Sequence, residues 1–289
     1  MIWVVGCRGL LGREVVRHLQ SAGESHIGTD VEADISDADV LWSFLRGRKP
    51  SWIINCAAYT AVDKAEDNQD AVYRVNFEGP RNLAAIAQEN GSTMIHVSTD
   101  YVFDGEGSFP YTEDQPVDPV GVYGKSKAEG EKAVADELES HYIVRTAWLF
   151  GKHGTNFVHT MLRAMNERDS VGVVSDQRGS PTYAVDLAST LVAIAARGEP
   201  IPYGIYHYTN EGETTWYEFA QSIYTEGQQR GLIQGNCVIQ PIHTSEFPTK
   251  SKRPAYSVLS KDKTRRALGL IIPSWRDALC RFLDELTST

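Results

Sequence analysis

The feature that most constrains the fold is a glycine-rich turn at the start of the chain. Residues 2–5 form an apolar run with the composition of a buried strand, and this run ends at Gly6. Further glycines stand at positions 9 and 12, and from residue 10 onward apolar residues fall at helical spacing. Strand, tight turn and helix in this order bring bare backbone close to the helix N-terminus, as in an open α/β sheet.

The alternation of strand and helix continues to about residue 150. Short apolar runs predict strands over residues 2–5, 25–29, 52–58, 93–98 and 142–148. Apolar residues at 3.6-residue spacing predict helices over residues 10–20, 38–47, 68–90 and 122–138. Strands that are apolar on both sides belong to a parallel sheet with helices on both faces. We therefore predict an α/β fold, a doubly wound parallel sheet of the Rossmann type that binds ligands at its carboxyl edge.

The glycine turn predicts a site for a nucleotide cofactor. Its spacing is GxxGxxG rather than the commoner GxGxxG, but a pyrophosphate can still lie against bare backbone at the positive end of a helix. Gly6, Gly9 and Gly12 are therefore candidate contacts, and the alternative is a tight turn without a ligand. Asp30 can bind ribose hydroxyls, which favours NAD, whereas Arg8 can pair with a 2′-phosphate unless it is only a surface charge. We expect both NADPH and NADH to bind, with NADPH slightly preferred.

From about residue 151 the pattern is less regular. Helices are predicted over residues 155–167, 184–196, 214–229 and 273–286, and short strands over 171–174, 204–208 and 237–239. We expect residues 1–150 to form the NAD(P)-binding domain, completed by about 184–210. Residues 151–183 and 211–289 then form a smaller, interleaved C-terminal lobe that binds substrate.

The candidate catalytic pair is Tyr123 and Lys127, which share one face of a predicted helix. A nearby ammonium lowers the pKa of a tyrosine and so makes it a usable proton donor or acceptor. Such a pair also arises by chance, so its surroundings decide. Thr99 ends the fourth predicted strand, where its hydroxyl can reach a substrate oxygen. The alternative for this segment is a strand-end turn built by Ser98, Thr99 and Asp100.

Charge and composition exclude other classes. The chain has 28 Lys and Arg against 38 Asp and Glu, a formal net charge of −10, which disfavours a nucleic-acid partner. No run approaches the roughly 18 apolar residues of a membrane span, and the first residues lack a secretory pattern, so we expect a cytoplasmic protein. Cys7, Cys56, Cys237 and Cys280 stand far apart, which predicts reduced thiols rather than disulfides or a zinc cluster.

Together these residues resemble the extended short-chain dehydrogenase/reductases and, more narrowly, the dTDP-4-dehydrorhamnose reductase family. The resemblance covers nearly the whole chain and is most specific at residues 98–105, 145–151, 176–182 and 253–257. It implies NAD(P)H-dependent reduction of the C4 ketone of dTDP-4-dehydro-6-deoxy-L-mannose to dTDP-L-rhamnose, a precursor of cell-surface polysaccharide. Thr99 would orient the ketone, Tyr123 would protonate the alkoxide, and Lys127 would hold the nicotinamide ribose. Related dehydratases carry Asp-Glu after the threonine, whereas Tyr101 follows Asp100 here, which argues for simple reduction.

The resemblance also assigns ligand contacts. The implied cofactor contacts, besides those already named, are Leu10, Leu11, Asp34, Ile35, Ala57, Ala58, Tyr59, Asn76, Tyr123 and Lys127. The implied substrate contacts are Thr99, Phe103, Asp104, Tyr123, Trp148 and Arg253, the last of which would pair with the diphosphate. The alternatives are a core aromatic for Trp148 and a surface charge beside a turn proline for Arg253.

Two alternatives stay open: a reductase or epimerase of another nucleotide sugar, and a non-catalytic NADP-binding regulatory subunit resembling the methionine adenosyltransferase β subunit. Some family members dimerise through Mg²⁺ held by glutamates. Glu14 matches one such position and Asp186 stands near a second, but no third ligand is identified. We predict no metal site, leave Mg²⁺ open without support, and expect a monomer or homodimer. The expected partner is a small-molecule nucleotide sugar, with no nucleic acid and no membrane.

Overall fold

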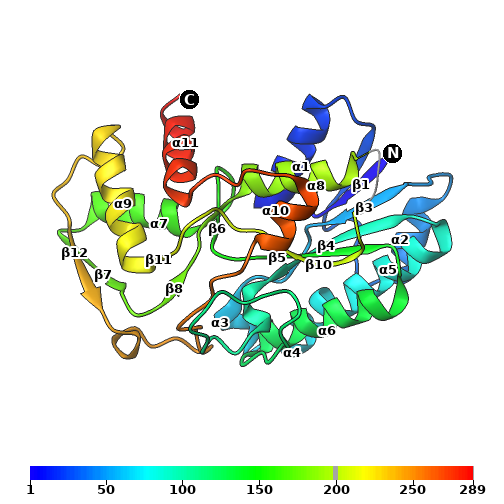
Figure 1. Cartoon of the computed structure of the whole chain (residues 1–289), viewed down its shortest axis with the longest axis horizontal. Helices are drawn as coiled ribbons and strands as arrows, with labels where there is room; N and C mark the ends of the chain where they lie inside the picture. The colour runs from blue at the N-terminus through cyan, green and yellow to red at the C-terminus, as the bar shows by residue number, and fades with distance from the viewer. Residues whose placement is uncertain (198–200, 289) are drawn as a thin grey trace.

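The computed structural model describes residues 1–197 and 201–288. Its centre is a six-stranded sheet in the order β10-β5-β4-β3-β1-β2, and all neighbouring strands are parallel (Figure 1). The strands are β1 (Ile2–Val5), β2 (His26–Thr29), β3 (Trp52–Asn55), β4 (Thr93–Thr99), β5 (His141–Thr146) and β10 (Gly204–His207). The chain adds β2 on one side of β1 and every later strand on the other. This reversal is the point where a doubly wound sheet binds ligands.

Helices cover both faces of this sheet, which confirms the predicted fold class (Figure 1). One face packs against α1 (Leu10–Ser21), α8 (Ala184–Ala195) and α10 (Asp262–Leu268). The other packs against α2 (Ala38–Leu45), α5 (Gly79–Asn90) and α6 (Val122–Glu137). Ile53 and Ile54 fall in different cores because successive side chains of a strand point to opposite faces.

The helix predicted over residues 68–90 changes its winding part-way. It begins as α4 (Gln69–Tyr73), passes through a π-helical segment, η1 (Arg74–Glu78), and continues as α5. Pro80 sits in the first turn of α5 and has no N–H to donate to the carbonyl of Asn76 four residues earlier. Apolar spacing does not reveal this local change, which is frequent at functional sites.

The remaining elements build a second core, on the left of Figure 1. Its main elements are α7 (Phe157–Glu167), α9 (Trp216–Gln229), α11 (Trp275–Thr287) and the parallel pair β7 (Ser170–Val174) and β12 (Val238–Ile242). Short pairs join β6 (Leu149–Phe150) to β9 (Thr182–Tyr183) and β8 (Arg178–Gly179) to β11 (Thr214–Thr215). Single helical turns are α3 (Val62–Ala65), η2 (Asp100–Val102) and η3 (Thr244–Glu246). Our sequence reading missed α10 and these short elements.

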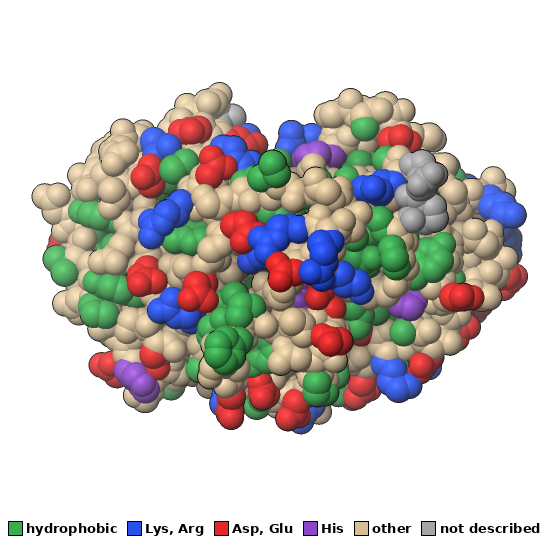
Figure 2. Space-filling model, viewed as in Figure 1, with side chains coloured by type: hydrophobic (Ala, Val, Ile, Leu, Met, Phe, Trp, Pro, Cys, Tyr) green, Lys and Arg blue, Asp and Glu red, His purple; other side chains and the backbone are tan. Residues whose placement is uncertain are grey.

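The predicted domain boundaries stay a prediction. The sixth strand, β10, comes from the 184–210 stretch that we expected to complete the first domain, of which residues 198–200 lie outside the described residues. Within the described part of the chain, no helix is both long and apolar enough to cross a membrane. All four cysteines are free thiols. On the face shown in Figure 2, Lys and Arg side chains lie among Asp and Glu side chains.

Candidate active site

The glycine turn is packed too tightly for a side chain at Gly6 and Gly12. A Cβ on Gly12 would lie 2.0 Å from the carbonyl oxygen of Gly6, so this position of α1 requires glycine. Gly9 is the N-cap of α1, and the N–H groups of the first helical turn have no carbonyl one turn earlier to bind. These N–H groups and the helix dipole favour an anion at this end.

A cavity of about 500 Å³ lies at this turn. It is lined by many of the predicted cofactor residues, namely Gly6, Arg8, Gly9, Asp30, Asp34, Ile35, Ala57 and Ala58. Leu10 begins α1 beside it, whereas the side chain of Leu11 packs into the core, which leaves the Leu11 backbone for any contact with a ligand. The glycine backbone, the helix terminus and the cavity fit a dinucleotide cofactor.

Arg8 and Asp30 both bind the same neighbour, Glu32, so the two residues are not independent. The Arg8 guanidinium forms an ion pair with Glu32 and lies 3.8 Å from Asp30 Oδ1. The backbone N–H of Asp30 donates to Glu32 Oε1 at 3.0 Å. Our sequence reading missed Glu32. Two carboxylates therefore face one guanidinium, and any anion that binds Arg8 has to compete with Glu32.

Tyr123 and Lys127 lie one turn apart on α6, and Thr99 ends β4 beside them. Both members of the pair are buried. A Cβ on Gly130 would lie 2.1 Å from the carbonyl oxygen of Asn76, so α6 packs directly on the backbone of η1. This is the carbonyl that Pro80 leaves free. The packing fixes the helix that carries Tyr123 and Lys127.

Asn76 ties this helix to the cofactor side of the sheet. Its Oδ1 accepts from the Tyr59 N–H at 2.8 Å, and its Nδ2 donates to the Tyr59 carbonyl and to Ser126 Oγ, both at 3.1 Å. The amide thus holds Tyr59 and the residue before Lys127. Asn76 thus contacts α6 through the side chain of Ser126.

Burial controls the protonation of the pair. It raises the pKa of Tyr123, reinforced by Asp100 and Tyr101 and opposed by a hydrogen bond with Thr99. Burial lowers the pKa of Lys127 to about 8, against the charge of Glu131. The Nζ of Lys127 donates to the Val97 carbonyl at 2.8 Å. The structure does not show the lowered Tyr123 pKa that we expected from Lys127, so Tyr123 is a protonated phenol suited to giving a proton.

A second cavity, of about 360 Å³, is lined by residues of the second core, such as Phe157 and Met161, and by Asp100 and Tyr101, which directly follow β4. Trp148 forms part of its wall and has a φ of 48°, a left-handed conformation that no other non-glycine residue in the described ranges adopts. Its ring stacks on Trp216 with centroids 3.5 Å apart and planes 8° from parallel. Strain of this kind is common at ligand sites. Trp148 is thus a wall of the cavity, and Trp216 is a neighbour that sequence spacing did not reveal.

Arg253 lines the same cavity but already has partners. Its Nη2 donates to Asp63 Oδ2 at 2.6 Å and its Nη1 to the Tyr101 hydroxyl at 3.0 Å. Asp63 and Arg253 are 190 residues apart in sequence. No local pattern marks them as partners, and we did not predict the pair.

Phe103 and Asp104 are not part of the wall of the 360 Å³ cavity. The Phe103 ring stacks on Tyr111 with centroids 4.3 Å apart and is almost fully buried. Asp104 accepts a hydrogen bond from the Tyr111 hydroxyl at 2.5 Å. Neither lines the 360 Å³ cavity, and their contact with substrate stays a prediction.

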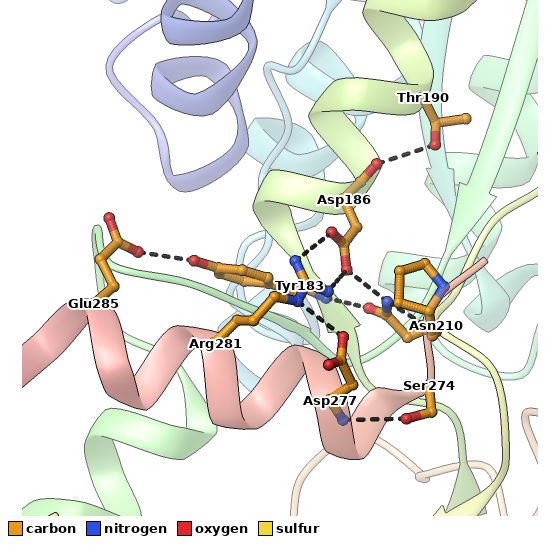
Figure 3. Close-up of polar contacts among 9 residues, drawn as sticks. Tyr183, Asp186, Thr190, Asn210, Ser274, Asp277, Arg281 and Glu285 are labelled. Atoms are coloured by element: carbon orange, nitrogen blue, oxygen red, sulfur yellow. Dashed lines mark hydrogen bonds and ion pairs between the residues drawn. The ribbon is translucent and has the colours of Figure 1, made fainter. Parts of the chain in front are cut away.

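Both carboxylates considered for a shared metal have protein partners. Glu14 is buried and pairs with Arg17 at 2.7 Å. Both oxygens of Asp186 bind Arg281, at 2.9 and 2.7 Å, and Asn210 donates to one of them (Figure 3). In the part of the chain that the structure describes, no three His, Cys, Asp or Glu side chains gather to hold a metal. Arg281 thus supplies the positive charge at Asp186.

Comparison with known proteins decides the family. The family model described as "RmlD substrate binding domain" matches residues 1–288. The dTDP-4-dehydrorhamnose reductase of Aggregatibacter actinomycetemcomitans is 43% identical over 281 residues, 96% of each chain. The chain belongs to the dTDP-4-dehydrorhamnose reductase family. This confirms the resemblance, and the chain is an oxidoreductase.

Two further relatives carry names that state a cofactor or a substrate. A crystal structure of dTDP-4-dehydrorhamnose reductase from Bacillus anthracis str. Ames, in complex with NADP, is 36% identical, covers 98% of both chains and has a TM-score of 0.92. A probable dTDP-4,6-dihydroxy-2-methyloxan-3-one 4-ketoreductase from Streptomyces antibioticus is 38% identical over 283 residues, 96% of this chain and 93% of its own. Relatives at similar identity thus carry different substrate names. The cofactor class is a nicotinamide dinucleotide.

Proposed function

We propose that this enzyme reduces the C4 ketone of dTDP-4-dehydro-6-deoxy-L-mannose, with NADPH or NADH, to give dTDP-L-rhamnose. The observation that carries the proposal is the meeting of Thr99, Tyr123 and Lys127 at the carboxyl end of β4, in a chain that also holds the glycine turn. The enzyme acts in the cytoplasm on a small molecule, as a monomer or homodimer.

Each residue of the catalytic group has one task. The bound cofactor supplies the hydride. Tyr123 donates its phenolic proton to the C4 oxygen, and its raised pKa keeps that proton in place at neutral pH. The Thr99 hydroxyl donates to Asp100 Oδ1 at 2.9 Å, and rotation about its C–O bond turns the same hydrogen toward the ketone. Lys127 holds the nicotinamide ribose.

The cofactor preference depends on Arg8 and Glu32. We expect NADPH to be slightly preferred because the 2′-phosphate can take Arg8 from Glu32. Arg8→Ala then lowers the NADPH to NADH ratio of kcat/KM by about tenfold, and Glu32→Gln raises it. Steady-state kinetics with both cofactors check this. An unchanged ratio in Arg8→Ala removes the role of Arg8.

A second candidate is reduction of another dTDP-4-keto sugar, which the 38% identity to the Streptomyces antibioticus ketoreductase favours. Both candidates use the same catalytic residues, so substrate choice separates them. Loss of NADPH absorbance is measured with dTDP-4-dehydrorhamnose, dTDP-4-keto-6-deoxy-D-glucose and a UDP-4-keto sugar. The first proposal expects the highest kcat/KM with dTDP-4-dehydrorhamnose. A higher value with another dTDP-4-keto sugar supports the second, and no turnover with any of them contradicts both.

A further inference from the structure

Trp148 holds a backbone conformation that its side chain disfavours. It lies between β5 and β6 and has a φ of 48°, in the left-handed region that residues other than glycine rarely adopt. Such a conformation persists only where the surrounding structure over-determines it. Part of that support is a backbone hydrogen bond, because the Trp148 carbonyl accepts from the Thr182 N–H at 3.1 Å. Contacts of the indole supply further support.

The indole is contacted by two residues that one pair of strands brings together. β8 and β11 are antiparallel, with Gly179 opposite Thr214. A Cβ on Gly179 would lie 2.5 Å from Cε2 of the Trp148 indole, so the glycine leaves the room that the indole fills. Trp216 directly follows β11, and its ring stacks on the same indole with centroids 3.5 Å apart. We call Gly179 and Trp216 the indole clamp.

The position of Trp216 is fixed by the helix that it begins. The Thr215 hydroxyl accepts from the Glu218 N–H at 3.1 Å, and the Glu218 carboxylate accepts from the Thr215 N–H at 3.0 Å, which caps α9 at this end. The Trp216 ring also contacts Phe157 of α7, with centroids 4.5 Å apart. Trp216 is therefore anchored in the second core, whereas Trp148 leaves the end of the central sheet.

We propose that Trp216 is a positioning residue that holds Trp148 in its left-handed conformation and so sets one wall of the 360 Å³ cavity. The inference rests on the proposed function and on the predicted contact of Trp148 with the substrate. Trp216 acts through Trp148 and takes no part in proton transfer. Loss of the stack should therefore weaken substrate binding, and it should leave the cofactor cavity at the glycine turn unchanged.

Kinetics and a crystal structure of Trp216→Leu test the proposal. We expect KM for dTDP-4-dehydrorhamnose to rise about tenfold, with kcat and the KM for NADPH within about twofold of the native values. In the crystal structure, φ of Trp148 leaves the left-handed region. Trp216→Phe keeps an aromatic ring and restores most of the substrate affinity. Trp275→Leu is the matched control: Trp275 packs on Phe219 in the same core but does not line the cavity, so its loss lowers Tm and leaves KM unchanged.

A double-mutant cycle shows whether Trp216 acts through Trp148 or contacts the substrate itself, since both rings line the cavity. Trp148→Ala alone raises KM. If Trp216 acts only through Trp148, adding Trp216→Leu to this variant raises KM no further. Additive effects of the two substitutions would make Trp216 a direct substrate contact and overturn the proposal.

Gly179→Ala disturbs the indole clamp from its other member and leaves α9 intact. The added methyl group has to displace the indole, so we expect KM to rise as in Trp216→Leu. A native KM in folded Trp216→Leu, or an unchanged φ of Trp148 in its crystal structure, overturns the proposal. If Trp216→Leu does not fold, a native KM in Gly179→Ala overturns it instead. If the native enzyme reduces no 4-keto sugar, only the proposed function fails, and φ of Trp148 in the variants still decides the role of the clamp.

Discussion

Two parts of the proposed substrate site are built in different ways. In the first, the catalytic end, Thr99, Tyr123 and Lys127 are buried, and each has a fixed neighbour within the sheet or on α6. In the second, the Arg253 end, Arg253 lines the 360 Å³ cavity and is held by an ion pair with Asp63, whose side chain is 42% exposed.

The two ends differ in which protein contacts have to change when the substrate binds. The catalytic end needs at most the rotation of a hydroxyl, so its geometry exists before the substrate arrives. At the Arg253 end, the proposed contact with the diphosphate requires one anion to replace another at Arg253. The catalytic end should therefore control kcat, and the Arg253 end should control KM.

The largest effect is expected from Tyr123→Phe, which removes the donated proton and keeps the ring. We expect kcat to fall by about 10²- to 10⁴-fold, with NADPH binding retained. Steady-state kinetics and fluorescence titration with NADPH check the two halves. Tyr73→Phe is the matched control, because it loses a hydroxyl bound only to Glu129 on the surface. Near-native turnover in Tyr123→Phe would show that the catalytic end is wrongly assigned.

Arg253→Ala is expected to change KM rather than kcat. Loss of a charge-assisted contact with the diphosphate raises KM by about 10- to 100-fold, while kcat changes little. Lys252→Ala, next to it in sequence and paired only with exposed Glu106, serves as control and should resemble the native enzyme. A fall in kcat with an unchanged KM would remove the contrast between the two ends.

The smallest effect is expected from Asp63→Asn. This change keeps an acceptor for the Ser251 N–H and removes the charge that competes for Arg253. Because a partly exposed ion pair contributes little, KM should fall by only about two- to fivefold. The opposite result, a KM raised as far as in Arg253→Ala, would mean that Asp63 orients the arginine rather than competing with the substrate.

The grouping of Thr99, Tyr123 and Lys127 could be predicted from the sequence because its signals are local. Gly6, Gly9 and Gly12 stand within one turn, Tyr123 and Lys127 stand one helical turn apart, and Thr99 closes an apolar run. Parallel strands end at one edge of a sheet, so residues at strand ends meet whatever the loop lengths. The fold class followed from the same alternation.

The partners of these residues could not be predicted in the same way. Asp63 meets Arg253, and Trp216 meets Trp148, only because the second core folds against the strand ends. The winding change at η1 follows from a missing N–H at Pro80 and leaves the apolar spacing intact.

One measurement tests the contrast most directly: a crystal structure of the enzyme with NADP⁺ and dTDP-L-rhamnose. We predict the Tyr123 hydroxyl within hydrogen-bond distance of the sugar O4, with Thr99 and Lys127 in the places that they occupy in the present structure. We also predict that the Arg253 guanidinium has left Asp63 for the diphosphate. A complex in which Arg253 still binds Asp63, or in which Tyr123 lies away from O4, would contradict this contrast.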